Sequence, residues 1–378
     1  MVVGAHNQAG AVNRIIFANQ LRALAVPLVV INHWVGLYWF DAPLVAAATL
    51  SPPLVGMMPE WVRTVITGGP WNFGPLGVAI FFLISGFVIP MSLDQHSVRG
   101  FLRARLLRIY PTYMLAMLIQ LAVIAGFAWY WGIAFDISPR KIFANAFLIQ
   151  GLMHVSSFDL VNWTLVVEMI FYVLSAILAF KLRQRSIWPL ALVAVTATLL
   201  NSGFTVAIHR YPGFALAAPM KTAGTYASCL SFMFIGTLFT YHMRGRLTTT
   251  GLIAAVSAGL ALFWSGWALG VNPEQFPNTP GNYTAALVIF STAYAMRGWF
   301  RPNPVIDFLA AISFPLYLVH ALIGYSVIKL LTQSAGLAYE LALVVALAIV
   351  VLLAQLLHVT VERWSIRAGK ARAALEPA

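Results

Sequence analysis

The feature that most constrains this chain is a series of long apolar segments separated by short polar loops. A bilayer core about 30 Å thick is crossed by a helix of about 20 apolar residues. In lipid every backbone polar group needs an internal hydrogen bond, so such segments are expected to be helical. Ten of them lie at residues 15–40, 73–91, 109–131, 160–180, 187–208, 222–241, 250–270, 282–296, 305–331 and 341–361. The sequence therefore predicts an all-α, polytopic integral membrane protein.

The composition excludes a soluble globular protein of this size. Hydrophobic residues make up 61% of the 378 residues and charged residues only 9%, which is too few to cover a soluble surface. The single cysteine, Cys229, rules out an intramolecular disulfide and a Cys-rich metal site. No His or carboxylate cluster has the spacing of metal ligands, and no Gly-rich phosphate loop follows a strand. We therefore expect no metal, no permanently bound cofactor and no nucleotide-binding fold.

The excess of basic residues indicates a topology. There are 23 Lys and Arg against 11 Asp and Glu, and in so apolar a chain this charge is better explained by cytoplasmic loops than by nucleic acid. With ten spans and a cytoplasmic N-terminus, sixteen basic residues fall on the cytoplasmic side and six on the outer side. Residues 142–153 are too short to span and are predicted to be re-entrant or interfacial. Both termini are expected in the cytoplasm, and the protein is expected in an inner membrane.

One membrane-embedded domain is expected to fill residues 1–378. Residues 1–14 lack the apolar core and cleavage site of a signal peptide, so they are predicted to be a short cytoplasmic tail. Residues 363–378 are predicted to be a basic cytoplasmic tail. No loop is long enough for a separate soluble domain, so any chemistry must come from the spans and their short loops.

Ionisable side chains deep in the spans are candidates for function, because burying them in lipid is costly. Arg22, His33, Glu168 and His320 are in such positions. Arg22 and His33 are eleven residues apart, almost three helical turns, so they are expected on one face of the first helix. Glu168 is expected near the depth of His33, where it could orient the imidazole as a base. The alternatives are that Glu168 pairs with Arg22 or is a protonated structural donor, and that His33 and His320 are packed core histidines.

Four arginines precede the third apolar segment. Arg99, Arg103, Arg105 and Arg108 lie just before Tyr110, and Arg105 and Arg108 are neighbours on a helix. A guanidinium binds phosphate oxygens in a bidentate manner and stays charged, so this cluster suits a phosphate-bearing ligand. The alternative is ordinary positive-inside topology with contacts to anionic membrane lipid.

These residues together resemble the acyltransferase-3 family of bacterial multipass membrane acyltransferases, which modify cell-surface carbohydrates. Asn19-Gln20 stands where the family usually has Asp-Gly. The matching patterns are Arg-x10-His at Arg22 and His33, Phe-Phe-x-x-Ser-Gly-Phe at residues 81–87, Arg-x-x-Arg-x-Tyr-Pro at 105–111, Trp-Ser-Leu-x-x-Glu-x-x-Phe-Tyr at 163–172 with Thr164 in place of Ser, Ser-x-x-x-Tyr-Leu-x-His at 313–320 and a closing Glu at Glu362.

The resemblance implies an acyl-coenzyme A donor, most often acetyl-CoA, used as a co-substrate. Its nucleotide end is expected near Arg105 and Arg108, with Arg103 and Tyr110 as further contacts. Ser85 is expected to hydrogen-bond the donor, although a small residue in helix packing is an equal alternative.

The resemblance also implies where transfer takes place. His33 is expected to be the general base, with Glu168 as its orienter or as a second acid/base, and Arg22 along the path of the donor. Trp163 and His320 are expected near the acceptor. Direct attack by the acceptor hydroxyl and a covalent acyl-His intermediate both remain open.

We therefore predict a membrane O-acyltransferase that moves an acyl group from cytoplasmic acyl-CoA to a hydroxyl of a cell-surface or lipid-linked sugar. Two rivals are a transporter or flippase, which would share intramembrane charges and broken helices, and an enzyme of the same family that acylates a small secreted glycoside. The acyl chain length, the sugar and its hydroxyl are not encoded in any motif.

Overall fold

The computed structural model of the protein describes residues 2–211 and 213–374. Every regular element in these residues is a helix, which confirms the predicted all-α class. The α-helices are α1 (Val2–Ile31), α2 (Tyr38–Phe40), α3 (Ala42–Thr49), α4 (Glu60–Thr67), α5 (Phe73–Gln95), α6 (Val98–Trp131), α7 (Pro139–Ala146), α8 (Trp163–Ile177), α9 (Ala179–Arg183), α10 (Trp188–Arg210), α11 (Ala217–Met243), α12 (Thr249–Ala268), α13 (Asn278–Ala295), α14 (Pro304–Lys329), α15 (Tyr339–Leu357) and α16 (Arg363–Ala374). Three π-helical turns, η1 (Asn32–Leu37), η3 (Leu330–Ser334) and η4 (His358–Glu362), interrupt the longer helices, and η2 (Pro273–Gln275) is a short 3-10 turn.

All ten predicted spans are helices, but they do not all have the length and composition of a membrane span. Eight helices in the described residues do, namely 16–40, 73–95, 98–131, 188–210, 217–243, 249–268, 304–334 and 339–369. The other two predicted spans correspond to α8, with 15 residues, and to α13, with 18 residues and several polar ones. The chain is thus polytopic, while the count of ten spans and the side of each terminus stay predictions.

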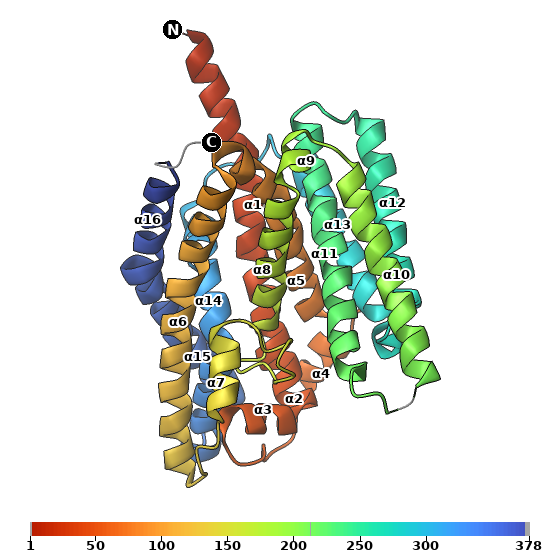
Figure 1. The fold of residues 1–378 in the computed structure, drawn as a ribbon. Coiled ribbons are helices and arrows are strands. Elements are labelled where there is room, and N and C mark those ends of the chain that lie inside the picture. The colour runs from red at the N-terminus through yellow and green to blue at the C-terminus, as the bar shows by residue number, and fades with distance from the viewer. Residues whose placement is uncertain (1, 212, 375–378) are drawn as a thin grey trace.

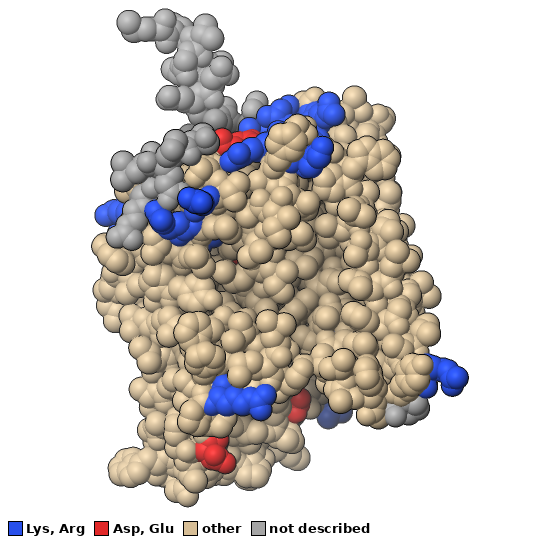
Figure 2. All heavy atoms as spheres, in the orientation of Figure 1, with Lys and Arg blue, Asp and Glu red and all other residues tan. Residues whose placement is uncertain are grey.

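The helices form one bundle whose centre is α1, α5 and α14 (Figure 1). In this view α10, α11 and α12 lie on one side of the centre, and α6, α15 and α16 on the other. On the face shown in Figure 2, Lys and Arg gather at the two ends and a broad band between them carries no charge. This distribution is the one expected for a bundle embedded in lipid.

The start of the third span and the two predicted tails differ from the prediction. The arginine cluster and the apolar segment after it form one continuous helix, α6, which Ser97 caps by accepting a hydrogen bond from the backbone N–H of Gly100 at 3.0 Å. The segment predicted as a C-terminal tail is helical through Ala374 and packs on this basic half of α6, with Gly369 against Ala104. The predicted N-terminal tail is likewise helical from Val2.

Between α6 and α8 the chain is mostly irregular. The short element predicted at residues 142–153 is observed as α7, which begins earlier because Ser138 caps it and Pro139 occupies its first turn. It ends at Ala146, and residues 147–162 form turns in which Leu148, His154 and Leu160 have positive φ. The late start of α8 follows from this loop.

A close contact between α5 and α11 holds the centre of the bundle together. A Cβ atom added to Gly236 would lie 2.3 Å from the carbonyl oxygen of Leu83, so only glycine fits there. The hydroxyl of Thr237 donates to the carbonyl oxygen of Gly86 at 3.0 Å across the same contact. Small residues that let backbones approach closely are a common means of helix association in membranes.

We predict that Gly236→Ala destabilises the protein by about 1–3 kcal/mol, because the methyl group forces two backbones apart. The thermal unfolding midpoint of the detergent-solubilised protein measures this. Gly203→Ala on α10 is the control, since no atom lies within 4 Å of a Cβ at that position. An equal midpoint for Gly236→Ala and wild type would contradict the close contact.

Candidate active site

Three cavities lie in series along α1. We call them the vestibule, the central cavity and the His33 cavity. Arg22, Arg108, Ser313 and Phe314 line both the vestibule and the central cavity. Val78 and Tyr317 line both the central cavity and the His33 cavity. Because neighbouring cavities share wall residues, the three cavities follow one another from the basic end of the bundle to His33, separated by these side chains.

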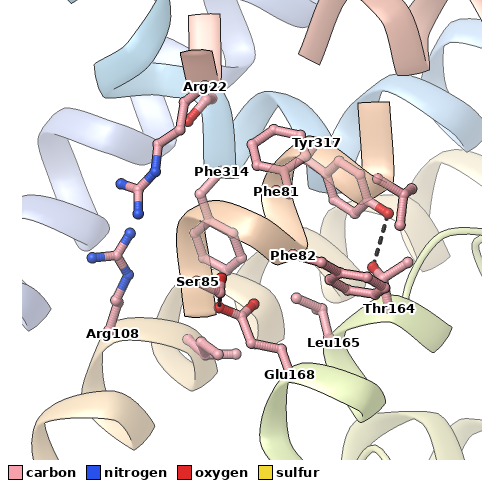
Figure 3. Close-up of a pocket in the computed structure, with 13 residues that line it drawn as sticks. Arg22, Phe81, Phe82, Ser85, Arg108, Thr164, Leu165, Glu168, Phe314 and Tyr317 are labelled. Carbon is pink, nitrogen blue, oxygen red and sulfur yellow. Dashed lines mark hydrogen bonds between the residues drawn. The ribbon is translucent and has the colours of Figure 1, made fainter. Parts of the chain in front are cut away.

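The central cavity contains two arginines and one carboxylate. Figure 3 shows the guanidinium groups of Arg22, from α1, and Arg108, from α6, pointing toward each other. Glu168 on α8 instead accepts hydrogen bonds from the hydroxyls of Ser85, at 3.2 Å, and Tyr172. No ion pair formed by the described residues includes either arginine. The guanidinium donors therefore face the cavity and favour an anionic group there.

The other residues predicted to bind the donor lie outside this cavity. Arg105 lies over the rings of Phe101 and Tyr172, with its guanidinium carbon 5.7 and 5.6 Å from their centroids. Arg103 is exposed, and the hydroxyl of Tyr110 donates to a loop carbonyl oxygen at 3.2 Å. Of the predicted arginine cluster, only Arg108 lines any of the three cavities.

His33 lies in the π-helical turn η1 that follows α1. Its Nδ1 is 2.7 Å from the hydroxyl oxygen of Tyr325, and its ring packs edge-on against His320 with the centroids 5.0 Å apart. Nε2 has no hydrogen-bond partner among the described residues, and His33 lines the cavity that bears its name. π-Helical turns often occur at functional sites, and this one presents a ring nitrogen to a cavity.

The structure does not pair Glu168 with His33. Trp163 begins α8 at the His33 cavity, and Glu168 lies five residues further along the helix, about 7.5 Å toward Arg22. The prediction placed the two side chains at one depth because it took this helix to begin at the outer membrane surface, whereas α8 begins at the level of the His33 cavity. Glu168 also forms no ion pair with Arg22, so its observed partners are Ser85 and Tyr172.

His320, predicted near the acceptor, is fully buried behind His33 and lines none of the three cavities. Its Nδ1 donates to the carbonyl oxygen of Tyr317 at 2.8 Å, and its Nε2 is buried without a partner. His320 therefore contacts His33 as a neutral packed ring, which agrees with the structural alternative.

Tyr317 and Tyr325 are site residues that the predictions missed. Tyr317 forms the boundary between two cavities, and its hydroxyl lies 2.8 Å from that of Thr164 (Figure 3). Its position in the Ser-x-x-x-Tyr-Leu-x-His pattern was the available signal. Tyr325 carries no such signal, because an apolar helix offers no reason to single out one buried tyrosine.

The vestibule adds a second histidine and carboxylate. His358 and Glu362 on η4 form a 2.6 Å pair beside Arg22 and Arg108. No group of three or more His, Cys, Asp or Glu in the described residues could hold a metal ion.

Asp159 organises the loop before α8 and so positions Trp163 and Glu168. Its carboxylate is buried and accepts from the backbone N–H groups of Val161, at 3.0 Å, and Asn162, at 2.7 Å. Burial raises the pKa of the Asp159 carboxyl to about 6, although these hydrogen bonds favour the charged form.

The fold and the cavities define a helical membrane protein whose polar groups line an internal path. A family model described as "Acyltransferase domain" matches residues 15–358, so the chain belongs to the acyltransferase-3 family. The exopolysaccharide production protein ExoZ of Rhizobium meliloti (strain 1021) is 27% identical, over 81% of this chain and 94% of its own. Acyltransferase MdmB of Streptomyces mycarofaciens is 26% identical, over 88% of this chain and 90% of its own.

A third relative, nodulation protein 10 of Rhizobium leguminosarum bv. viciae, is 25% identical over 74% of this chain and 78% of its own. No solved structure matches the chain. Family membership makes the protein an enzyme that transfers acyl groups other than amino-acyl groups, which favours the acyltransferase prediction over the transporter alternative.

We predict that Asp159 makes folding stability depend on pH. A raised carboxyl pKa means that the folded protein binds the proton more tightly, so the stabilisation present below about pH 4 is lost as pH rises to about 6. The full change corresponds to about 3 kcal/mol. In Asp159→Asn the unfolding midpoint should fall less than in wild type between pH 4 and 6.5. Asp136→Asn, which changes an exposed carboxylate, is the control, and parallel curves for Asp159→Asn and wild type would contradict the assignment.

Proposed function

We propose that the protein transfers an acyl group from acyl-CoA, most often acetyl-CoA, to a hydroxyl of a cell-surface or lipid-linked sugar. The observation that supports this most strongly is the path of three cavities along α1, with two arginines at one end and an available imidazole nitrogen at the other. The relative named for exopolysaccharide production supports a sugar as acceptor. The eight candidate spans support a membrane location, for which we propose a bacterial inner membrane.

The charged end of the donor would occupy the vestibule and central cavity. Arg22 and Arg108 offer donors to phosphate oxygens, and Ser85 lines the same cavity beside Glu168. The pantetheine arm of CoA is uncharged and extended. It would run past Tyr317 toward His33, which is roughly 16 Å from Arg22 along the helix axis. Arg103, Arg105 and Tyr110 would support the shape of this end and not touch the donor.

His33 would act as the general base of direct transfer. Its Nε2 accepts the proton of the acceptor hydroxyl while the hydroxyl oxygen attacks the thioester carbonyl carbon. Collapse of the tetrahedral intermediate breaks the C–S bond, and the proton passes from His33 to the departing CoA sulfur. Throughout, Nδ1 carries a proton and donates to the Tyr325 hydroxyl oxygen, which fixes the ring. Tyr325 thus takes the orienting role that the sequence had suggested for Glu168.

Trp163 would contribute to the acceptor side, because it lines the His33 cavity. Glu168 would balance the two arginines electrostatically and hold Ser85 and Tyr172 in place. The role of Trp163 follows from the cavity that it lines, and the role of Glu168 from its cavity and its two hydrogen bonds.

We predict that His33→Ala lowers acyl transfer by about 10²–10⁴-fold with donor affinity unchanged, because a general base acts mainly in the transition state. Tyr325→Phe should cost about threefold to tenfold, the range of one hydrogen bond. The double variant should be no worse than His33→Ala alone, since the two residues act as a unit. Transfer from radiolabelled acetyl-CoA measures all three. Wild-type turnover by a folded His33→Ala protein would refute the assignment.

We also predict that Arg108→Ala weakens CoA binding by about tenfold or more, because one cavity-facing phosphate contact is lost. Calorimetry should show a much smaller loss for a pantetheine thioester that has no phosphates. Arg246→Ala removes the same charge from an exposed position outside the three cavities and is the control. Equal losses for both ligands would show that Arg108 does not bind phosphate.

A further inference from the structure

The His33 cavity differs in charge from the other two. Neither Asp, Glu, Lys nor Arg lines it among the described residues. The central cavity has Arg22, Arg108 and Glu168 in its wall, and the vestibule has both arginines with Asp307 and Glu362. The path thus changes from charged to neutral at the boundary that Tyr317 forms.

The neutral cavity nevertheless contains polar groups that bind nothing in the protein. The side-chain amides of Asn32 and Gln275, the hydroxyl of Thr279 and the indole N–H of Trp163 have no hydrogen-bond partner among the described residues. By contrast, the hydroxyl of Thr225 in the same wall already accepts from a neighbouring amide, at 2.8 Å, and donates to a carbonyl oxygen. Amides and hydroxyls both donate and accept, which matches the hydroxyl groups of a sugar.

These free groups come from three parts of the bundle that meet at His33. Asn32 directly precedes His33 in η1, and Trp163 begins α8. Gln275 and Thr279 flank the start of α13. Gly74 gives the Asn32 amide its room, because a Cβ atom at Gly74 would lie 2.6 Å from the amide nitrogen.

The remaining wall is aromatic and apolar. Trp163 is half-buried, and Trp267 and Tyr283 complete the surface, with Tyr283 stacked on Phe263 at 5.2 Å between centroids. Aromatic walls with a few polar groups that fix orientation are typical of small-molecule sites. A pyranose ring has an apolar C–H face and polar edges, so it complements both kinds of surface.

Charge then decides between classes of sugar. A neutral ring that enters this cavity exchanges water for the four free polar groups. A carboxylate, phosphate or ammonium would lose hydration without any counter-charge in the wall, which is far more costly.

Building on the proposed function, we infer that the acyl acceptor presents an uncharged, hydroxyl-bearing ring to His33. Asn32, Trp163, Gln275 and Thr279 bind this ring. A uronic acid, a phosphosugar or a sugar with a free amine is not the residue that becomes acylated.

The test is to map the ester made by this enzyme in its source strain. Mass spectrometry and NMR of surface glycans and secreted glycosides, compared between wild type and a strain lacking the gene, locate the lost ester. We expect it on a neutral ring. An ester on a ring with a carboxylate, phosphate or free amine would overturn the inference while leaving acyl transfer intact. Loss of no ester would contradict the proposed function and, with it, the inference.

Complementation with charged variants tests the cavity itself. Gln275 lies at the exposed edge of the His33 cavity. Gln275→Glu replaces an amide that can donate to a sugar hydroxyl with a carboxylate that only accepts, and should restore about threefold to tenfold less ester than wild type at equal protein abundance and CoA affinity. Gln184→Glu, the same change at an exposed position outside the cavities, should restore the wild-type level. Full restoration by Gln275→Glu would overturn the assignment of this cavity to the acceptor.

Discussion

The structure depends on the cost of placing charge inside an apolar bundle. Arg22, Arg108 and Glu168 line a cavity inside the bundle, where a charged side chain requires either a partner or a polar environment. The carboxylate accepts hydrogen bonds from two hydroxyls and the arginines face each other, which leaves a positively charged cavity in the centre of the bundle. Gly236 on α11 packs closely against α5, the helix that carries Ser85 into that cavity.

Helix α1 connects this charged centre to the neutral His33 cavity. The helix carries Arg22 at the charged cavities and His33 at the neutral one, and the π-helical turn η1 turns the imidazole toward Tyr325. A charged donor and a neutral acceptor would each meet the cavity that matches its chemistry. The reaction would then take place where the two cavities meet, beside Tyr317.

Sequence periodicity was enough for the helical class and for placing Arg22 and His33 on the same path, because those features follow from single helices. The family followed from the resemblance of several short motifs along the chain. Finer geometry depends on contacts between helices. Arg105 and Arg108 are three residues apart, and only packing decides that the first lies on Tyr172 and the second in a cavity. Asp159 accepts a hydrogen bond from the backbone N–H of Asn162 and so sets where α8 starts. This start places Glu168 away from His33, which the sequence alone does not reveal. Tyr325 had no motif to reveal it.

The central claim is that donor and acceptor reach the site from opposite ends of the bundle. Sealed membrane vesicles of known orientation test this most directly, with radiolabelled acetyl-CoA supplied on one side only and label measured in a sugar acceptor on the other. The account predicts transfer when the donor is on the side of Arg22 and Arg108, and none when it is on the side of the His33 cavity. Transfer with the donor confined to the His33 side would contradict the account.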